Sequence, residues 1–358
     1  MVKPSFSRRR MMQAIGATAL SPSVAPAAAV SGMGVEGRDT PKLCMGASAA
    51  HLDEGSLRRV TQLGVGHVVM GGPPIPWEES EIRSRMDRLQ AGGLKLANMM
   101  MVGFPNTIYG RPGRDAEIEK IRQSIRAAGR AGLPVIEYNF YAHRIVEGYF
   151  EEPGRGGAGM TSFDYSKVKD LPPLPDEGAH NLEEMWANVT YFLKAVVPVA
   201  QESGVRLALH PNDPPAPISR GSEQIMGSVE GWKRLVDIVP STSNGITFDC
   251  GVTREMGHDP VEVCRYFGAK DRINHVHFRN VRVRIPREKY TEVFPDEGEV
   301  NMFAVMKELV RQKYPRVILP EHPRVLDADR EQPGNGSYTG WVFNVAYARA
   351  MFQAAMAS

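Results

Sequence analysis

The sequence has few cysteines, no long apolar run and no clustered charge. Only three cysteines occur in 358 residues, so no disulfide framework holds the fold together and at least one cysteine is free or a ligand. The apolar runs are too short to span a bilayer, which argues against a stable membrane anchor. The 43 basic and 41 acidic residues leave a net charge of +2, and no block of Lys and Arg is interleaved with aromatic residues. Nucleic acid is therefore not favoured as a partner.

The N-terminus has the composition of an export signal. Three consecutive arginines, Arg8, Arg9 and Arg10, precede a short, weakly apolar stretch and then the run of alanines at 27–29. A basic region, a short apolar region and an Ala-x-Ala site are typical of a secretory signal, and adjacent arginines resemble the twin-arginine type. We therefore expect a signal peptide over residues 1–29, a linker over 30–41 and one domain over 42–358. The expected location is the periplasm, or the cytoplasm if the signal is not used.

Short apolar runs alternate with amphipathic segments from residue 42 onwards. Eight strands are expected, at residues 43–46, 67–70, 95–102, 134–140, 205–210, 245–250, 273–278 and 316–320. Helix-like segments separate them, and one more follows the last strand. Eight strand–helix repeats predict a (β/α)8 TIM barrel of the α/β class. The alternative is a doubly wound open sheet, but the Gly-rich first turn that usually marks it is absent.

One long irregular stretch, residues 141–180, interrupts the repeats after the fourth strand. It is rich in Gly and Pro. In a barrel it lies on the face where parallel strands end, and a loop of this length there is typical of a lid or binding segment. An insertion without function is the alternative.

The last four expected strands end in residues that can bind a metal. They are His210, Cys250, His277 and Glu321. Because the chemistry of a barrel lies where its strands end, four consecutive strands bring imidazole, thiolate, imidazole and carboxylate to one face. Each residue alone is weak evidence, but the four in register predict a divalent metal site.

Several neighbours are candidates for other roles. Asp213 follows His210 in a stiff Pro-rich loop and is either an acid–base group or a loop cap. Arg279 faces the interior near the mouth and either binds a substrate carboxylate or forms a structural ion pair. His275 lies deeper than His277 on the same face and is expected to be a core or supporting group. His322 is expected to point away, unless the strand has already ended. Tyr338 lies in a loop after the eighth strand and could reach the site.

These residues resemble the motifs of the mannonate dehydratase family. The segment His-Pro-Asn-Asp-Pro-Pro at 210–215 is similar to the family's His-Pro-Asp-Asp-Pro-Pro, and His-Phe-Arg-Asn-Val at 277–281 is similar to His-Leu-Arg-Asn-Val. Tyr-Asn-Phe at 138–140, Ser-Asn-Gly at 243–245 and Pro-Glu-His at 320–322 also correspond to family motifs. The resemblance covers most of the chain after the signal.

The resemblance implies a TIM barrel with one divalent ion, commonly manganese, that dehydrates D-mannonate to 2-keto-3-deoxy-D-gluconate. It places the metal ligands at His210, Cys250, His277 and Glu321 and the catalytic tyrosine at Tyr338. We expect Tyr338 and Asp213 to share the acid and base roles, with Arg279 holding the substrate carboxylate. The resemblance also suggests a homo-oligomer.

The sequence departs from the family at several positions. Glu321 stands where the family has aspartate, Leu319 where it commonly has arginine, Asn212 where it has aspartate, and Glu137 where it often has cysteine. By softness, a thiolate with two imidazoles suits Zn²⁺ or Fe²⁺, whereas the resemblance suggests Mn²⁺; Co²⁺ and Mg²⁺ are further alternatives.

Two other functions fit the same residues. A metal-dependent sugar isomerase or epimerase uses the same proton abstraction but expels no water. An exported sugar-acid binding protein on an inactive barrel would bind its ligand without turnover. The expected partner in every case is a small sugar acid or a related carbohydrate.

Overall fold

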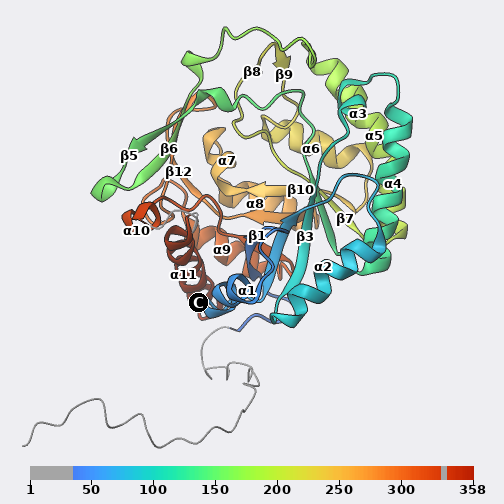
Figure 1. The fold of residues 1–358 in the computed structure, drawn as a ribbon. Helices are drawn as coiled ribbons and strands as arrows, with labels where there is room; N and C mark the ends of the chain where they lie inside the picture. The colour runs from blue at the N-terminus through green and yellow to red at the C-terminus, as the bar shows by residue number, and fades with distance from the viewer. Residues whose placement is uncertain (1–34, 332–336) are drawn as a thin grey trace, which may run out of the picture. The chain divides into compact units, whose positions relative to one another are not determined.

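The computed structural model describes residues 35–331 and 337–358, and its main body is a barrel (Figure 1). Eight parallel strands close on themselves in the order β1, β14, β11, β10, β7, β4, β3, β2. They are β1 (Lys42–Ala47), β2 (His67–Gly71), β3 (Lys95–Met101), β4 (Val135–Tyr138), β7 (Arg206–Leu209), β10 (Asn244–Asp249), β11 (Ile273–His277) and β14 (Val317–Leu319). The predicted TIM barrel is confirmed. The predicted signal peptide lies outside the described residues and stays a prediction.

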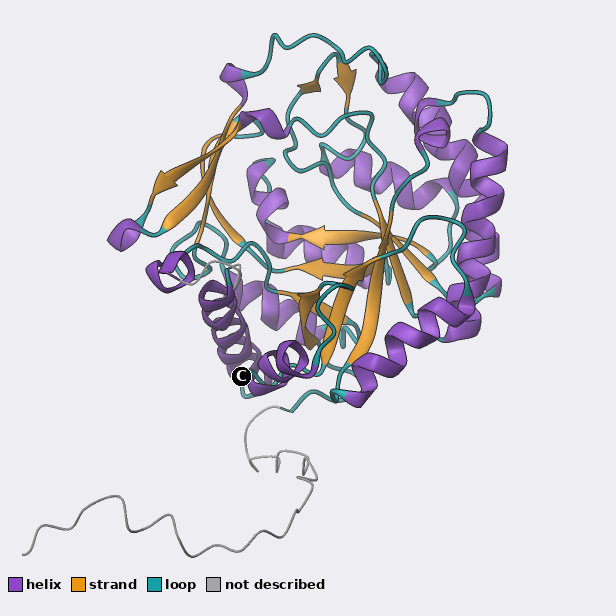
Figure 2. Ribbon diagram, in the orientation of Figure 1, coloured by secondary structure: helices purple, strands orange, loops and turns teal. Residues whose placement is uncertain are grey.

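Helices surround the strands (Figure 2). The longer ones are α1 (Glu54–Gln62), α2 (Glu79–Ala91), α4 (Arg114–Ala131), α5 (Leu182–Glu202), α6 (Val229–Ile238), α8 (Pro260–Ala269), α9 (Met302–Arg311) and α11 (Tyr338–Met356). Short helices are α3 (Pro105–Tyr109), α7 (Cys250–Glu255) and α10 (Asp327–Glu331). Within the described residues, no helix is both long enough and apolar enough to cross a membrane.

The helices pack against the barrel through apolar stripes with helical spacing. In α4 the stripe includes Ile118, Ile121 and Ile125, all buried. Burying a side chain of this size contributes about 1.5–3 kcal/mol. Helix α5 begins with a capping box, in which the Asn181 side chain accepts from the Glu184 N–H and the Glu184 carboxylate accepts from the Asn181 N–H. These local signals fix where the helices begin and which face turns inward.

The long insertion contains its own secondary structure. Strands β5 (Tyr149–Pro153) and β6 (Gly159–Asp164) join β12 (Asn280–Ile285) and β13 (Lys289–Val293) in an antiparallel sheet of order β12, β13, β6, β5, beside α10 in Figure 1. The insertion also contains the 3-10 turns Val146–Gly148, Arg155–Gly157 and Tyr165–Lys167. The small strands β8 (Ile218–Ser219) and β9 (Ser222–Glu223) lie outside it, in the loop after β7. The sequence analysis did not predict the β12–β13 hairpin. It extends the barrel strand β11 and brings a second set of side chains to the mouth.

The interior of the barrel is polar just below its mouth. Asn98, Glu137, Thr247 and His275 lie there, each no more than 4% exposed. The Asn98 amide and the Thr247 hydroxyl both donate to the Glu137 carboxylate, at 3.0 and 2.7 Å. Barrel interiors are usually filled by branched apolar side chains, so a buried polar layer indicates a function at this end.

Candidate metal centre and active site

Four side chains from four consecutive barrel strands converge at the mouth. His210 directly follows β7, Asp249 and His277 are the last residues of β10 and β11, and Glu321 follows β14. The His277 Nδ1 atom lies 3.2 Å from His210 Nε2, 3.0 Å from Glu321 Oε1 and 3.7 Å from Asp249 Oδ2. His210, Asp249 and His277 each offer a ligand atom within 4.8 Å of the other two, and Glu321 adjoins His277, so these side chains could hold one ion.

The ring of His210 is held with one nitrogen turned to the centre. Its Nδ1 atom lies 2.7 Å from the Pro211 carbonyl oxygen, to which it donates, so Nε2 is left as the acceptor. Burial and the neighbouring His277 lower the pKa of His210. The ring is therefore neutral, the form that binds a metal.

The charges around His277 favour a cation at the centre. Burial lowers the pKa of His277, but Glu321 and Glu137 outweigh this effect and raise it well above the usual value. Oε1 of Glu321 is buried and has no hydrogen-bond partner within the described residues. A divalent ion can replace the proton on Nδ1 and satisfy this oxygen, so the residues fit a bound metal.

Cys250, which the sequence analysis predicted as a ligand, does not join this group. It is the first residue of α7, and its thiol donates to the carbonyl oxygens of His277 and Arg279 at 3.3 and 3.2 Å. Burial raises the pKa of this thiol further above the physiological range. Strand β10 ends one residue earlier than expected, so Asp249, rather than Cys250, lies beside the His277 ring.

The register of β10 explains this difference. Asp249 is paired with His277 on β11, and Thr247 with His275. Because alternate residues of a strand face the same side, Thr247 and Asp249 point inward while Phe248 points outward. The alternation of polar and apolar residues at 246–249 is visible in the sequence and could have identified Asp249.

Arg279 is buried among carboxylates and does not line the cavity. Its Nε atom donates to Asp249 at 2.9 Å and its Nη1 atom to Glu255 at 2.7 Å, while Nη2 lies 3.4 Å from Asp213 Oδ2. The close approach requires Gly251, where a Cβ atom would lie 2.8 Å from the Arg279 side chain. This geometry supports the structural ion pair rather than the predicted contact with the substrate carboxylate.

Above the centre lies a cavity of about 180 Å³. Its lining residues are Met100, Asn139, Tyr141, Arg144, His210, Asp213, His277, Glu321 and His322. The cavity therefore brings together three of the predicted metal ligands, His210, His277 and Glu321. Asp213, a predicted acid–base candidate, faces the same cavity. Arg144, from the long insertion, was missed by the sequence analysis, since nothing in its local sequence shows that the insertion folds back over the mouth.

Asp213 and Arg144 form one wall of the cavity. The Arg144 side chain donates from Nε to the Asp213 carbonyl oxygen at 2.6 Å, and its Nη2 lies 3.3 Å from Asp213 Oδ2. The hydroxyl of Tyr149, on β5, donates to Asp213 Oδ1 at 2.7 Å. The insertion thus fixes the position of Asp213 while the guanidinium of Arg144 remains partly exposed at the cavity.

His322 faces the cavity because β14 ends at Leu319, which is the exception allowed for in the sequence analysis. Its backbone has φ of 48°, in the left-handed region. The Nδ1 atom lies 2.9 Å from Glu292 Oε2, on the β12–β13 hairpin, and Nε2 lies 3.5 Å from Glu321 Oε1. Burial lowers the pKa of His322, but the charges of Glu292 and Glu321 raise it overall. His322 therefore places an imidazole, paired with Glu292, at the edge of the cavity.

Tyr338, the predicted catalytic tyrosine, lies elsewhere in this structure. It is the first residue of α11, and its hydroxyl donates to the Arg59 carbonyl oxygen on α1 at 3.1 Å. It does not line the cavity. The segment just before it, residues 332–336, lies outside the described residues, and a catalytic role for Tyr338 stays a prediction.

Comparison with known proteins identifies relatives that share this architecture. The family model described as D-mannonate dehydratase (UxuA) matches residues 48–175 and 179–358. The mannonate dehydratase of Thermotoga petrophila is 30% identical over 329 residues, which cover 80% of this chain and 90% of that protein. The crystal structure of mannonate dehydratase from Streptococcus suis serotype 2 has a TM-score of 0.81 and 27% identity, and the match covers 88% of this chain and 95% of that one.

A more distant likeness concerns the fold alone. A structure of L-ribulose 3-epimerase has a TM-score of 0.56 at 12% identity, covering 89% of this chain and 96% of that one. It shows that the same barrel occurs in enzymes with another activity. The family model, by contrast, covers the strands and loops that carry the candidate site. The chain belongs to the D-mannonate dehydratase family.

Proposed function

We propose that this protein is a metal-dependent hydro-lyase that dehydrates D-mannonate to 2-keto-3-deoxy-D-gluconate. Membership of the family and the relatives named mannonate dehydratase support the reaction. The observation that carries the proposal is the convergence of His210, Asp249, His277 and Glu321 below a cavity that His322 and Asp213 also line.

The metal ligands in this proposal are two imidazoles and two carboxylates. When bound, the ion supplies a positive charge that stabilises the enediolate formed as the C2 proton leaves. With Asp249 in place of a thiolate, the ligand set is one of nitrogen and oxygen atoms. Such a set suits Mn²⁺, and the argument from softness for Zn²⁺ loses its main support. We therefore propose Mn²⁺.

The remaining side chains account for the movement of protons. His322 holds a proton at Nε2 beside the cavity and donates it to the C3 hydroxyl, which leaves as water. Asp213, the cavity carboxylate outside the ligand group, accepts the C2 proton. The partly exposed guanidinium of Arg144 binds the substrate carboxylate. The enol that remains becomes the 2-keto product by taking up a proton at C3.

Turnover of D-mannonate by Mn²⁺-loaded protein tests the proposal. The product should be lighter than the substrate by one water, as measured by mass spectrometry. Metal bound at one ion per chain without any product would contradict it. A product of unchanged mass would instead indicate the epimerase reaction, for which the shared barrel is the argument.

We also propose export by the twin-arginine route, supported by Arg8, Arg9 and Arg10. Fractionation of cells that express the full chain should recover the protein in the periplasm. Replacing Arg8, Arg9 and Arg10 with lysine should retain it in the cytoplasm. Equal distribution of both proteins would contradict export by this route.

A further inference from the structure

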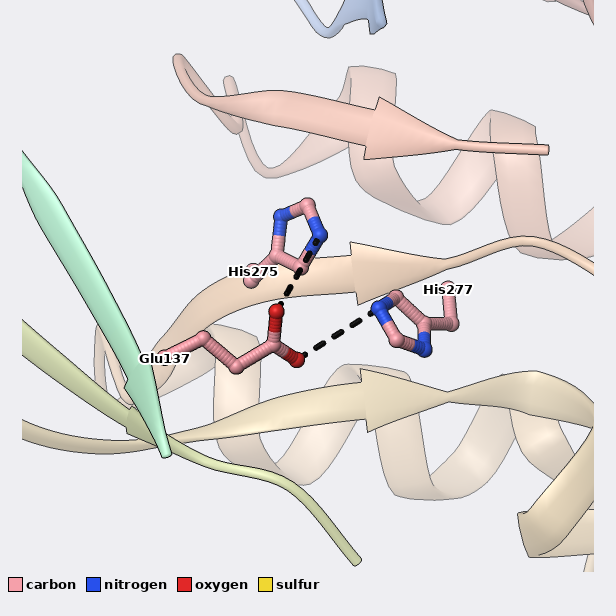
Figure 3. A group of neighbouring side chains, drawn as sticks. All are labelled: Glu137, His275 and His277. Carbon is pink, nitrogen blue, oxygen red and sulfur yellow. Dashed lines mark ion pairs between the residues drawn. The ribbon is translucent and has the colours of Figure 1, made fainter. Parts of the chain in front are cut away.

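A second cluster of metal-binding side chains lies deeper in the barrel than the centre described above. Glu137 on β4 extends across the interior toward His275 and His277 on β11 (Figure 3). Its Oε1 atom lies 3.4 Å from His277 Nε2, and its Oε2 atom lies 4.0 Å from His275 Nε2. One ligand atom from each of the three residues lies within 4.8 Å of the other two. The cluster uses the nitrogen of His277 that the outer centre leaves free.

The nitrogens of this cluster are buried without hydrogen-bond partners. His275 is 0% exposed, and neither of its ring nitrogens has a partner within the described residues; the same holds for His277 Nε2. A buried polar group left unsatisfied costs about 1–3 kcal/mol. Two of these atoms, His275 Nε2 and His277 Nε2, face the Glu137 carboxylate, and this arrangement requires an explanation.

Direct hydrogen bonds to Glu137 do not explain why these nitrogens face its carboxylate. The separations of 3.4 and 4.0 Å to the two imidazoles are ion-pair distances without hydrogen-bond geometry. The Glu137 carboxylate is instead fixed by donors from two other strands, Asn98 at 3.0 Å and Thr247 at 2.7 Å. Metal-binding carboxylates are commonly held by such outer hydrogen bonds. Its ion pairs within the described residues are with the two imidazoles.

We propose that Glu137, His275 and Nε2 of His277 bind a second divalent cation, of the zinc class, inside the barrel. The ion takes the place between the three side chains and satisfies the unpaired nitrogens. His277 would then bind the outer ion through Nδ1 and the inner ion through Nε2, with the protons of both ring nitrogens released to solvent. The bridge rests on the outer site of the proposed function, whereas the inner site itself needs only the three side chains.

The chemistry of the ligands selects the class of ion. Two imidazoles and one carboxylate are a common ligand set for Zn²⁺. His275 Nε2 is buried, has no hydrogen-bond partner within the described residues and lies 4.0 Å from Glu137 Oε2, so it is placed to act as a ligand. All three residues are at most 4% exposed, so substrate cannot reach the inner ion. Its role is therefore to hold His277 and to offset the buried charge of Glu137.

Metal content and X-ray scattering test this proposal together. The full chain is purified from cells grown with added Zn²⁺, desalted, and measured for zinc per folded chain. We expect one more zinc ion per chain in the wild type than in His275→Gln, whereas Glu321→Gln, which alters only the outer centre, should keep the inner ion. His258→Gln is the matched control, because His258 is exposed and belongs to neither site, and it should keep the zinc content of the wild type.

An anomalous difference map of wild-type crystals at the zinc edge locates the ions without any variant. A peak between Glu137, His275 and His277 supports the proposal even if His275→Gln fails to fold. A water molecule there, without anomalous signal, overturns it, as does a loss of zinc in His258→Gln. D-Mannonate turnover is measured on the same samples. Turnover without an inner ion refutes this inference alone, and an inner ion without turnover refutes the proposed function alone.

Discussion

At the scale of single residues, the structure separates two neighbours that the sequence does not distinguish. Asp249 and Cys250 are adjacent at the end of β10, and both are possible metal ligands. Only the carboxylate of Asp249 reaches the group around His277, while the Cys250 thiol donates to backbone carbonyl oxygens. Adjacent residues of a strand face opposite sides, so an error of one position in the predicted end of a strand selects the wrong side chain.

We predict that Asp249→Asn loses most of its Mn²⁺ affinity and that Cys250→Ser keeps it. The amide removes a negative charge from the ligand group, whereas a hydroxyl can replace the thiol as a donor to the carbonyls of His277 and Arg279. Changes next to a metal commonly cost 10–100-fold in affinity, and the loss of a ligand should cost at least about that much. Isothermal titration of each metal-free variant with Mn²⁺ measures the two affinities. Loss of affinity in Cys250→Ser with affinity kept in Asp249→Asn would restore the thiolate as the ligand.

The acid role is also assigned at this scale. His322→Gln should lower kcat by about 10²–10⁴-fold, because general acid catalysis contributes that much, while the bound Mn²⁺ remains at one per chain. Tyr338→Phe should keep near wild-type kcat, because the hydroxyl contacts the Arg59 carbonyl rather than the cavity. Steady-state kinetics of the two variants, with metal analysis of the same samples, shows whether His322 or Tyr338 is the acid. A large loss of kcat in Tyr338→Phe alone would favour the tyrosine predicted from the family resemblance.

At the scale of elements, the small sheet of β5, β6, β12 and β13 completes the mouth of the barrel. Strand β5 carries Tyr149, whose hydroxyl donates to Asp213, and β13 carries Glu292, which pairs with His322. The prediction of a binding segment at 141–180 is consistent with this position, since Arg144 and Tyr141 both line the cavity. The sheet therefore links the insertion to two of the proposed acid–base groups.

An ion pair between β6 and β13 gives this sheet a pH dependence. The Lys289 ammonium and the Ser166 hydroxyl lower the pKa of Asp164 to about 2, with Lys289 Nζ 2.6 Å from the carboxylate. A lowered carboxylate pKa stabilises the fold above its unfolded value, near 4, and this stability is lost as pH falls toward about 2. Asp164→Asn should therefore lower the free energy of unfolding at pH 7 by about 1 kcal/mol or less, since Lys289 is partly exposed.

Urea unfolding at pH 7 and at lower pH measures the difference. The gap between wild type and Asp164→Asn should narrow steadily below about pH 4. Glu183→Gln serves as the control, because Glu183 lies exposed in the first turn of α5, away from this sheet. A gap that is independent of pH would contradict a contribution from the charge of Asp164.

At the scale of the whole molecule, the barrel was predictable because its signals are local. Each predicted strand overlaps one strand of the closed barrel, since apolar runs and helix caps mark both ends of every unit. The antiparallel sheet was not predicted, because its two hairpins are joined by the pairing of β13 with β6, which lie more than a hundred residues apart in the sequence. The same distinction applies to the site. His210, His277 and Glu321 could be predicted from the sequence because they lie at strand ends. Arg144 and Glu292 could not, because their positions depend on how distant segments pack.

The metal centre should also stabilise the whole barrel, because its ligands come from four strands of the closed sheet. A ligand that binds only the folded state stabilises it by about 2.7 kcal/mol at a concentration 100 times its Kd. Mn²⁺ at that excess should raise the Tm of metal-free wild type by a few degrees. Asp249→Asn at the same Mn²⁺ concentration should show a smaller shift, because its Kd is higher, and Cys250→Ser should match the wild type. Calorimetry of the three proteins with and without Mn²⁺ makes the comparison. An equal shift in all three would mean that Mn²⁺ stabilises the protein at a place other than the centre formed by His210, Asp249, His277 and Glu321.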